Sequence, residues 1–253
     1  MMSEAAPTAA VLIIGDEILS GRTQDANIQF LGQRLGALGI RLQECRIVPD
    51  VPAAIADALN ALRRTYTYVF TTGGIGPTHD DITTDCVAAA FGRRVVRHPK
   101  AVAAMTDYYG DKLNEARLRM ANVPDGPDVM LIENHISIAP GYRIENVFVI
   151  AGVPSVARAM FDAVAPSLRK GPPVYSQSAD GNIREGDIAA ALERIQAAHP
   201  NVTIGSYPFM RNEKLGASIV ARSTDKAEIA AVMAKVAQMM RDVGAEPILG
   251  PAP

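Results

Sequence analysis

Short apolar runs alternate along this chain with segments in which apolar residues recur every three or four positions. The run 10–14, Ala-Val-Leu-Ile-Ile, ends at Gly15 and is typical of a strand buried on both faces. Residues 28–38 then follow helical spacing, and Gly39 stands where such a helix would end. The same patterns predict further strands at 46–48, 66–72, 129–132 and 147–150, and further helices around 55–62, 83–91, 101–113 and 156–168.

This order of elements predicts an α/β fold of three layers. Strands that alternate with helices of about a dozen residues form right-handed crossovers, so the sheet should be mostly parallel with helices on both faces. Ligands of such sheets bind beyond the carboxyl ends of the strands. Two loops are expected at that edge, 15–17 after the first strand and 73–78 after the third.

A second unit is predicted after the sequence Lys-Gly-Pro-Pro at 170–173, because a glycine and two prolines end a helix and stiffen a junction. Its order of elements predicts a small α+β split-βαβ subdomain. The expected elements are strands at 174–177, 202–207, 217–222 and 247–249 and helices around 188–195 and 229–243. We therefore expect a flexible N-terminus at 1–9, a first domain at 10–170 and a second at 174–253.

Composition narrows the classes of function. The 253 residues include 25 Lys and Arg against 27 Asp and Glu, divided 17 to 18 up to Gly171 and 8 to 9 after it, so neither part has the basic surface that nucleic-acid binding requires. Two cysteines are too few for a disulfide framework, and no apolar stretch has the length of a membrane span or a signal peptide. We expect a cytoplasmic protein that binds neither nucleic acid nor membrane.

The strongest chemical signal is the segment Gly73-Gly74-Ile75-Gly76 between a predicted strand and a predicted helix. Such a turn brings backbone N–H groups close to an anion, and the helix adds its positive end. Asp80 and Asp81 follow within five residues, and carboxylates together with phosphate suit Mg²⁺. Neighbouring residues cannot both face one ligand, so we expect Asp81 to be the ligand and Asp80 to support it by capping the helix at Thr83.

Two further carboxylates are expected at the same edge of the sheet. Asp16 follows the first strand, and Asp50 follows the second. Asp16 is also explained as a charge at a helix N-terminus, and Asp50 as a turn residue. Both interpretations remain open at this point, as does an incidental or proton-donating role for the neighbouring His79.

These residues give the chain an extended resemblance to a known family. The sequence is similar to the MoaB/Mog molybdopterin-binding family, and within it to the N-terminal region of CinA-like proteins. The resemblance spans about residues 10–168, and the second unit looks like the small α/β region that follows in CinA-like chains. It is carried by Gly15-Asp16-Glu17-Ile18-Leu19-x-Gly21, Asp25-x-Asn27, Val48-x-Asp50, Thr72-Gly73-Gly74-x-Gly76-Pro77-Thr78-x-Asp80-Asp81-x-Thr83 and Ala139-Pro140-Gly141.

The resemblance implies a phosphorylated pterin or an adenine nucleotide as ligand, with acidic residues at Asp50 and Asp81 needed for activity. CinA-like relatives resemble metal-dependent pyrophosphatases of ADP-ribose, which implies a divalent cation such as Mg²⁺ at Asp81 and Asp16. It also implies a homo-oligomer, a dimer or trimer. The candidate catalytic residues are Asp81, Asp50 and Asp16, and the candidate ligand-binding residues are Gly15, Asn27, Gly73, Gly74, Gly76, Thr78, Asp80, Thr83, Pro140, Gly141 and Gly152.

Two alternatives accompany this hypothesis. Relatives that make molybdopterin transfer AMP from ATP to the pterin phosphate, so adenylyl transfer is the enzymatic alternative. The segment Ala-Gly-Val-Pro at 151–154, Val156 and Ser137 differ from the family pattern, which leaves a non-catalytic nucleotide or pterin binder as the other. Full-length CinA proteins carry an amidase domain, and since this chain ends at Pro253 we expect no amidase activity.

Overall fold

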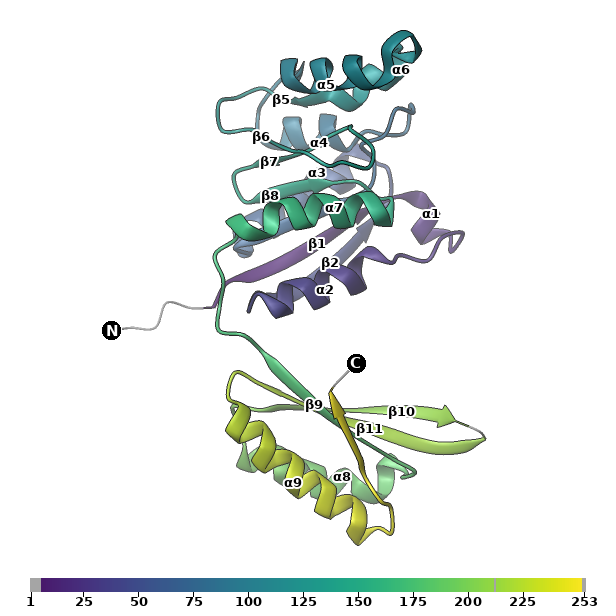
Figure 1. The fold of residues 1–253 in the computed structure, drawn as a ribbon, viewed down its shortest axis with the longest axis vertical. Helices are drawn as coiled ribbons and strands as arrows, with labels where there is room; N and C mark the ends of the chain where they lie inside the picture. Colours follow the sequence, from purple (N-terminus) through teal and green to yellow (C-terminus); the bar gives the residue numbers. More distant parts are fainter. Residues whose placement is uncertain (1–5, 212, 252–253) are drawn as a thin grey trace, which may run out of the picture. The chain divides into compact units, whose positions relative to one another are not determined.

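The structure is a computed structural model that describes residues 6–211 and 213–251. The chain forms two compact units, Met1–Gly171 and Pro172–Pro253, whose boundary falls inside the Lys-Gly-Pro-Pro segment. Figure 1 shows the elements of both units. Within the described ranges, none of the helices has the length and apolar composition that a membrane span requires.

The first unit contains most of the helices and strands predicted for it. Several short elements were not predicted, among them β4, β5, β7 and α6. In chain order it has β1 (Thr8–Ile14), α1 (Asp16–Leu19), α2 (Asn27–Ala37), β2 (Arg41–Val48), α3 (Pro52–Thr65), β3 (Tyr68–Thr72), α4 (Thr83–Ala90), β4 (Val95–Arg97), α5 (Pro99–Tyr109), α6 (Glu115–Leu118), β5 (Asn122–Pro124), β6 (Met130–Ile132), β7 (Gly141–Ile144), β8 (Val147–Ile150) and α7 (Pro154–Val164), with 3₁₀ turns at Gly110–Lys112, Arg119–Ala121 and Ala165–Ser167.

A six-stranded sheet in the order β2-β1-β3-β8-β7-β6 forms the middle layer. The strands β2, β1, β3 and β8 run parallel, while β7 and β6 are antiparallel to their neighbours. The predicted mostly parallel sheet is confirmed. Because the carboxyl ends of parallel strands meet at one edge, the loops after β1, β2, β3 and β8 lie together there.

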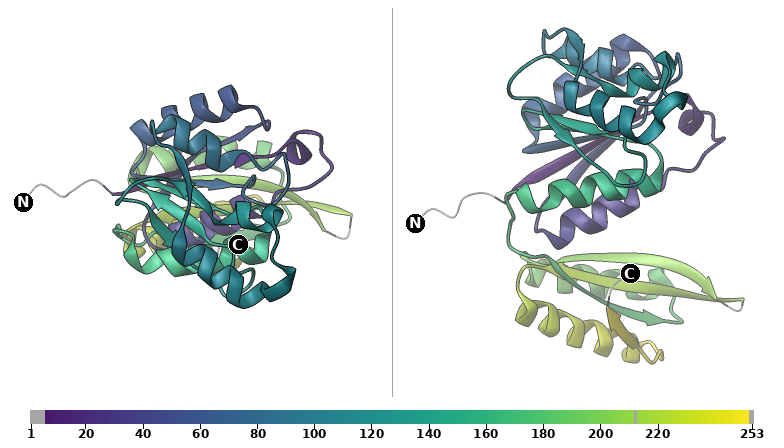
Figure 2. Two further views of the ribbon diagram at one scale, coloured as in Figure 1. Left: turned by 90° about the horizontal axis from the view of Figure 1, so that it is seen from above. Right: turned by 45° about the horizontal axis from the view of Figure 1, so that its top comes forward.

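Helices cover both faces of this sheet, as the apolar runs predicted. On one face, α2 and α7 pack on side chains that include Val11, Phe70 and Phe148. On the other, α3 and α4 pack on side chains that include Leu12 and Val69. Figure 2 shows α2 and α7 side by side on their face. The consecutive strand residues therefore point alternately into two cores, which explains why β1 is apolar along its length.

Element boundaries differ from the prediction where turn geometry decides them. The strand β1 begins at Thr8, inside the segment 1–9 that was expected to be flexible; residues 1–5 lie outside the described residues. The helix predicted to reach 113 ends at Tyr109, because Gly110 has a φ of 49°. Glu145 has a φ of 48° in the two-residue connection between β7 and β8, and this tight hairpin makes β7 a strand that the apolar pattern did not reveal.

The second unit is a four-stranded antiparallel sheet with two helices. The sheet order is β10-β11-β9-β12, and the β-α-β-β-α-β succession confirms the predicted split-βαβ subdomain. Both helices contribute to one core with side chains from β9 and β11. Its elements are β9 (Tyr175–Gly181), α8 (Glu185–Ala198), β10 (Thr203–Arg211), β11 (Lys214–Ser223), α9 (Lys226–Asp242) and β12 (Ile248–Pro251).

Candidate functional site

The glycine turn after β3 has a backbone that only glycine fits. Gly73 and Gly74 have φ values of 101° and 66°. A Cβ on Gly73 would lie 2.1 Å from the carbonyl oxygen of Ile14, and one on Gly74 would lie 2.2 Å from Oγ1 of Thr83. The turn is therefore packed against the end of β1 on one side and the start of α4 on the other.

Thr83 fastens this turn to α4. Its side chain is buried, its Oγ1 donates to the carbonyl oxygen of Gly73 at 2.9 Å, and its backbone N–H donates to the carbonyl oxygen of Gly74 at 3.0 Å. The sequence suggested Thr83 as a ligand contact. In the structure its hydroxyl hydrogen is engaged within the protein, where it fixes the shape of the turn.

Asp81 lies at the far end of the same turn. Its Oδ2 accepts hydrogen bonds from the backbone N–H of Thr78 at 2.8 Å and from the Thr78 hydroxyl. A Cβ on Gly76 would lie 2.6 Å from this oxygen, so glycine leaves the space that the carboxylate occupies. These contacts hold the Asp81 side chain in one orientation and use one of its two oxygens.

The capping role predicted for Asp80 is wrong. The residue before α4 is Ile82, and no side chain caps the helix. Asp80 is exposed instead, and the Thr78 side chain lowers its pKa. One of the first N–H groups of α4, that of Thr83, donates instead to the carbonyl oxygen of Gly74. His79 is almost fully exposed, with Nδ1 at 3.9 Å from Asp80.

Asp16 and Asp50 are brought together by the loops after β1 and β2. The backbone N–H of Asp16 donates to Oδ2 of Asp50 at 2.9 Å, and the N–H of Gly15 donates to the carbonyl oxygen of Val48 at 3.2 Å. The side chain of Glu17 fills the space beside Gly15. The expected meeting of these two loops at one edge is observed, with the Asp50 carboxylate fastening it.

Asn27 reaches the glycine turn from α2. It is 3% exposed, and its Nδ2 donates to the carbonyl oxygen of Gly152 at 2.8 Å. Gly152 follows β8 and packs against Gly73, since a Cβ on it would lie 3.2 Å from the Cα of Gly73. The Asn27 Oδ1 is buried and has no hydrogen-bond partner among the described groups. It is thus an unused acceptor beside the turn.

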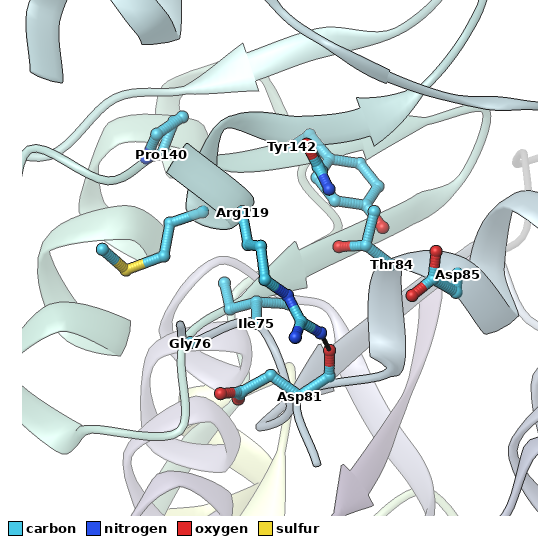
Figure 3. Close-up of a pocket in the computed structure, with 10 residues that line it drawn as sticks. Ile75, Gly76, Asp81, Thr84, Asp85, Arg119, Pro140 and Tyr142 are labelled. Carbon is cyan, nitrogen blue, oxygen red and sulfur yellow. Dashed lines mark hydrogen bonds between the residues drawn. The ribbon is translucent and has the colours of Figure 1, made fainter. Parts of the chain in front are cut away.

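A pocket opens beside the end of the turn, and Figure 3 shows it. Pro140 and Gly141 precede and begin β7; Pro140 contributes to the pocket wall, while a Cβ on Gly141 would lie 2.4 Å from the carbonyl oxygen of Val149. Gly141 is therefore needed for close strand packing. The pocket is lined by Ile75, Gly76, Asp81, Thr84, Asp85, Arg119, Met120, Asn122, Pro140 and Tyr142.

Arg119 and Tyr142 are pocket residues that the sequence analysis missed. The Arg119 guanidinium extends toward the backbone of Asp81, where it makes a long contact of 3.5 Å to the carbonyl oxygen (Figure 3). Tyr142 is 1% exposed; burial raises its pKa, and the neighbouring Thr84 opposes this shift only in part. No spacing in the sequence marks either residue. Arg119 belongs to a short 3₁₀ turn, and β7 was not predicted.

The structure restricts how a metal ion can be held. Among the described residues, no three His, Cys, Asp or Glu side chains are placed to bind a metal together. Asp81 has one oxygen outside its bonds to Thr78, and Mg²⁺ is often held by one or two carboxylates, phosphate oxygens and water. The donors present fit a Mg²⁺ that arrives on a phosphate ligand; they do not fit a metal held by side chains alone.

Comparison with known protein families shows to which family the unit with the glycine turn belongs. Residues 10–170 match the family described as "Probable molybdopterin binding domain". The chain belongs to this molybdopterin-binding domain family. Residues 173–246 match the family described as the FAD synthase middle domain. The resemblance seen in the sequence of the first unit is confirmed. The similarity of the second unit to the FAD synthase middle domain was not predicted from its sequence pattern.

Individual relatives match different shares of this chain and of their own length. A protein of Aeropyrum pernix is 35% identical over 217 residues, which cover 81% of this chain and 80% of that protein. A "Probable FAD synthase" of Caenorhabditis elegans is 28% identical over 258 residues, and the match covers 92% of this chain but 50% of that protein. The solved structure of a CinA protein with unknown function from Thermoplasma acidophilum is 32% identical, with a TM-score of 0.60 over 64% of this chain and 98% of that one.

Proposed function

We propose that the glycine turn binds a nucleotide with a diphosphate group and that the protein hydrolyses the phosphoanhydride in the presence of Mg²⁺. ADP-ribose is the first candidate substrate because of the resemblance to CinA-like proteins. FAD is the second, because the second unit matches the FAD synthase middle domain. In both, a phosphoanhydride joins the 5′-phosphate of adenosine to the phosphate of a second group.

One observation carries this proposal. The Asp81 carboxylate is fixed by Thr78 in the wall of a pocket that begins at the glycine turn. A phosphate near the N–H groups of such a turn would be positioned without side-chain charge, and a fixed carboxylate beside it would orient the attacking water. The unused Oδ1 of Asn27 adds an acceptor for a hydroxyl or amino group of the ligand.

In the proposed step, a water oxygen forms a bond to one phosphorus while the bridging P–O bond breaks. The second phosphate leaves with the electron pair, and Asp81 takes the proton of the water before passing it to solvent. Mg²⁺ bound to the phosphate oxygens would reduce their negative charge during this change. From ADP-ribose the products are AMP and ribose 5-phosphate. Asp50 acts by holding the loop that carries Asp16.

The test is an assay of the purified chain with ADP-ribose, FAD and ATP, with and without Mg²⁺, following AMP release. Asp81→Asn should lower kcat by about 100-fold or more, the size expected for loss of a general base. Asp57→Asn, which changes an exposed carboxylate on α3, is the matched control and should leave kcat unchanged. Absence of AMP release from all three substrates, or equal rates for Asp81→Asn and the unmodified chain, would contradict the proposal.

A second candidate is adenylyl transfer from ATP to a phosphorylated pterin, and membership of the molybdopterin-binding domain family favours it. The same turn would then hold the triphosphate, and the pterin phosphate would replace water as the nucleophile. This reaction requires a second substrate and leaves an adenylylated product with release of pyrophosphate. Nucleotide binding without any product would instead support the non-catalytic binder.

A further inference from the structure

Arg119 differs from the other half-buried arginines of the described chain. A half-buried guanidinium normally rests against a carboxylate or an aromatic ring, because removing it from water is otherwise unfavourable. Among the described residues, Arg119 forms no ion pair and no ring contact: its charge acts on the exposed Asp80 only from a distance, where it helps to lower the pKa of that carboxylate. Its one hydrogen bond is the 3.5 Å contact to the Asp81 carbonyl oxygen. The partners of the others are Glu44 for Arg46, Glu145 and Phe91 for Arg63, Tyr109 for Arg117, Phe148 for Arg143 and Tyr207 for Arg222.

The position of Arg119 places its guanidinium where a ligand in the pocket could bind to it. Its side chain crosses the pocket that Gly76 and Asp81 also line, and its guanidinium ends beside the backbone of Asp81 (Figure 3). Most of its N–H donors are therefore available on the pocket side. A guanidinium presents its donors as a planar fork that matches two oxygens of one phosphate.

A second observation in the same pocket is independent of Arg119. The Tyr142 hydroxyl is buried and makes no hydrogen bond of acceptable geometry with the described groups, although the Thr84 side chain lies close enough to act on its pKa. A buried polar group without a partner is destabilising, so a ligand oxygen that accepts from it would bind there favourably. Since burial raises its pKa, the hydroxyl remains a donor at neutral pH. Arg119 and Tyr142 thus supply a cation and a neutral donor to one pocket.

We infer that Arg119 and Tyr142 form a second anion site in a diphosphate ligand's binding pocket. This site binds the distal phosphate, the one further from the adenosine, while the glycine turn holds the proximal phosphate, the one attached to the adenosine. This inference rests on the proposed function and adds the residues that select a diphosphate over a monophosphate. During hydrolysis the distal phosphate is the leaving group. Arg119 then stabilises the charge that this group gains as the bridging bond breaks.

Calorimetric titration with ADP and with AMP, both in the presence of Mg²⁺, tests the inference without requiring turnover. Arg119→Met should weaken ADP binding by about 10- to 100-fold, the range for hydrogen bonds to a charged group, and change AMP binding by less than about threefold. Arg119→Lys should recover only part of the affinity, since a lysine lacks the fork. Tyr142→Phe should weaken ADP binding by about tenfold and spare AMP.

Arg64→Met on α3 is the matched control, because it removes an exposed arginine with the same change in charge, and it should leave both affinities unchanged. Circular dichroism establishes that each variant is folded. Millimolar guanidinium ion should restore ADP binding to Arg119→Ala, which a purely structural role would not permit. Equal losses for ADP and AMP in Arg119→Met, no loss for either, or no ADP binding by the unmodified chain would overturn the inference. ADP binding that depends on Arg119 without AMP release from ADP-ribose would overturn the hydrolase proposal alone.

Discussion

The two sheets of this protein place their loops differently, and this difference determines where a site can form. In the first unit, the parallel strands β1, β2, β3 and β8 all deliver their carboxyl ends to one edge. In the second unit, every hydrogen-bonded strand pair is antiparallel, so neighbouring strands deliver their carboxyl ends to opposite edges. Gly15, Asp50, Gly73 and Gly152 therefore meet, whereas no comparable gathering is built into the second sheet.

The two units also differ in what limits the substitutions that they tolerate. At the edge of the first sheet, the backbone itself is fixed by close approaches at Gly73 and Gly74. In the second unit, the main constraint is side-chain packing between the helices and the sheet, with Met240 and Val236 fully buried. Substitutions should thus act through backbone strain in one unit and through cavities in the other.

The largest effect is expected from Gly73→Ala. The φ of 101° disfavours any side chain, and the added Cβ would meet the Ile14 carbonyl oxygen at 2.1 Å. We expect a loss of about 3 kcal/mol or more in the free energy of unfolding of the first unit, measured by urea denaturation. The matched change Gly186→Ala, in open space on α8, should be neutral or stabilising by up to about 1 kcal/mol. Equal stabilities for the two variants would remove the contrast.

Met240→Ala should destabilise the second unit by about 2 to 4 kcal/mol, because it leaves a cavity between α9 and the sheet. Hydrogen exchange measured peptide by peptide should show faster exchange in 172–253. Exchange in the peptides of the first unit should stay unchanged. A uniform increase over both units would mean that they unfold together and would break the comparison.

Thr83→Val should cost about 1 to 2 kcal/mol in the first unit. The substitution preserves shape but leaves the Gly73 carbonyl oxygen without its 2.9 Å hydrogen bond. Thr106→Val, which removes an exposed hydroxyl on α5, serves as the control and should lie within about 0.5 kcal/mol of the unmodified chain. If both variants unfold alike, Thr83 does not fasten the turn.

The smallest effect should appear at alkaline pH. Burial, with Asp25 and Glu44 nearby, raises the pKa of Cys45 to about 11 from an ordinary value of 9.0. Between these values the folded thiol keeps a proton that the unfolded chain has lost, so stability should fall as pH rises through this window. Cys86 and Tyr142, whose pKa values are also raised, lie in the same unit. Hydrogen exchange at pH 8 and pH 10 should show the loss in the first unit; a loss confined to the second would contradict it.

The sequence predicted those parts of the fold that repeat a simple pattern. The apolar run of β1 and the helical spacing of 28–38 sufficed for the layers, because burial on two faces or on one stripe leaves a direct mark on composition. The glycine turn was equally readable, since steric need for glycine is local. The strand β7 was not, because its pairing depends on a hairpin whose key residue, Glu145, is an uncommon one at positive φ.

The candidate site was predictable only in part. The meeting of the Asp16 and Asp50 loops follows from parallel topology, and it is observed. The role of Asp80 was not predictable, because the start of α4 is joined to the glycine turn by the bond from the Thr83 N–H to Gly74, nine positions earlier, and spacing alone does not reveal such a contact. Arg119 could not be found either. Its significance comes from the absence of an ion pair or ring contact among the described residues, and sequence spacing does not reveal such an absence.

The packing of Gly152 against Gly73 links two loops that lie far apart in the chain. A methyl group on Gly152 would lie 3.2 Å from the Cα of Gly73, and a methyl group on Gly73 would lie 2.1 Å from the Ile14 carbonyl oxygen. The two loops therefore pack so closely that a larger residue in one would need a compensating change in the other. Substitutions that adapt this edge to a larger or smaller ligand would have to change both loops together. The exposed positions 153–155, which follow Gly152, can be substituted one at a time.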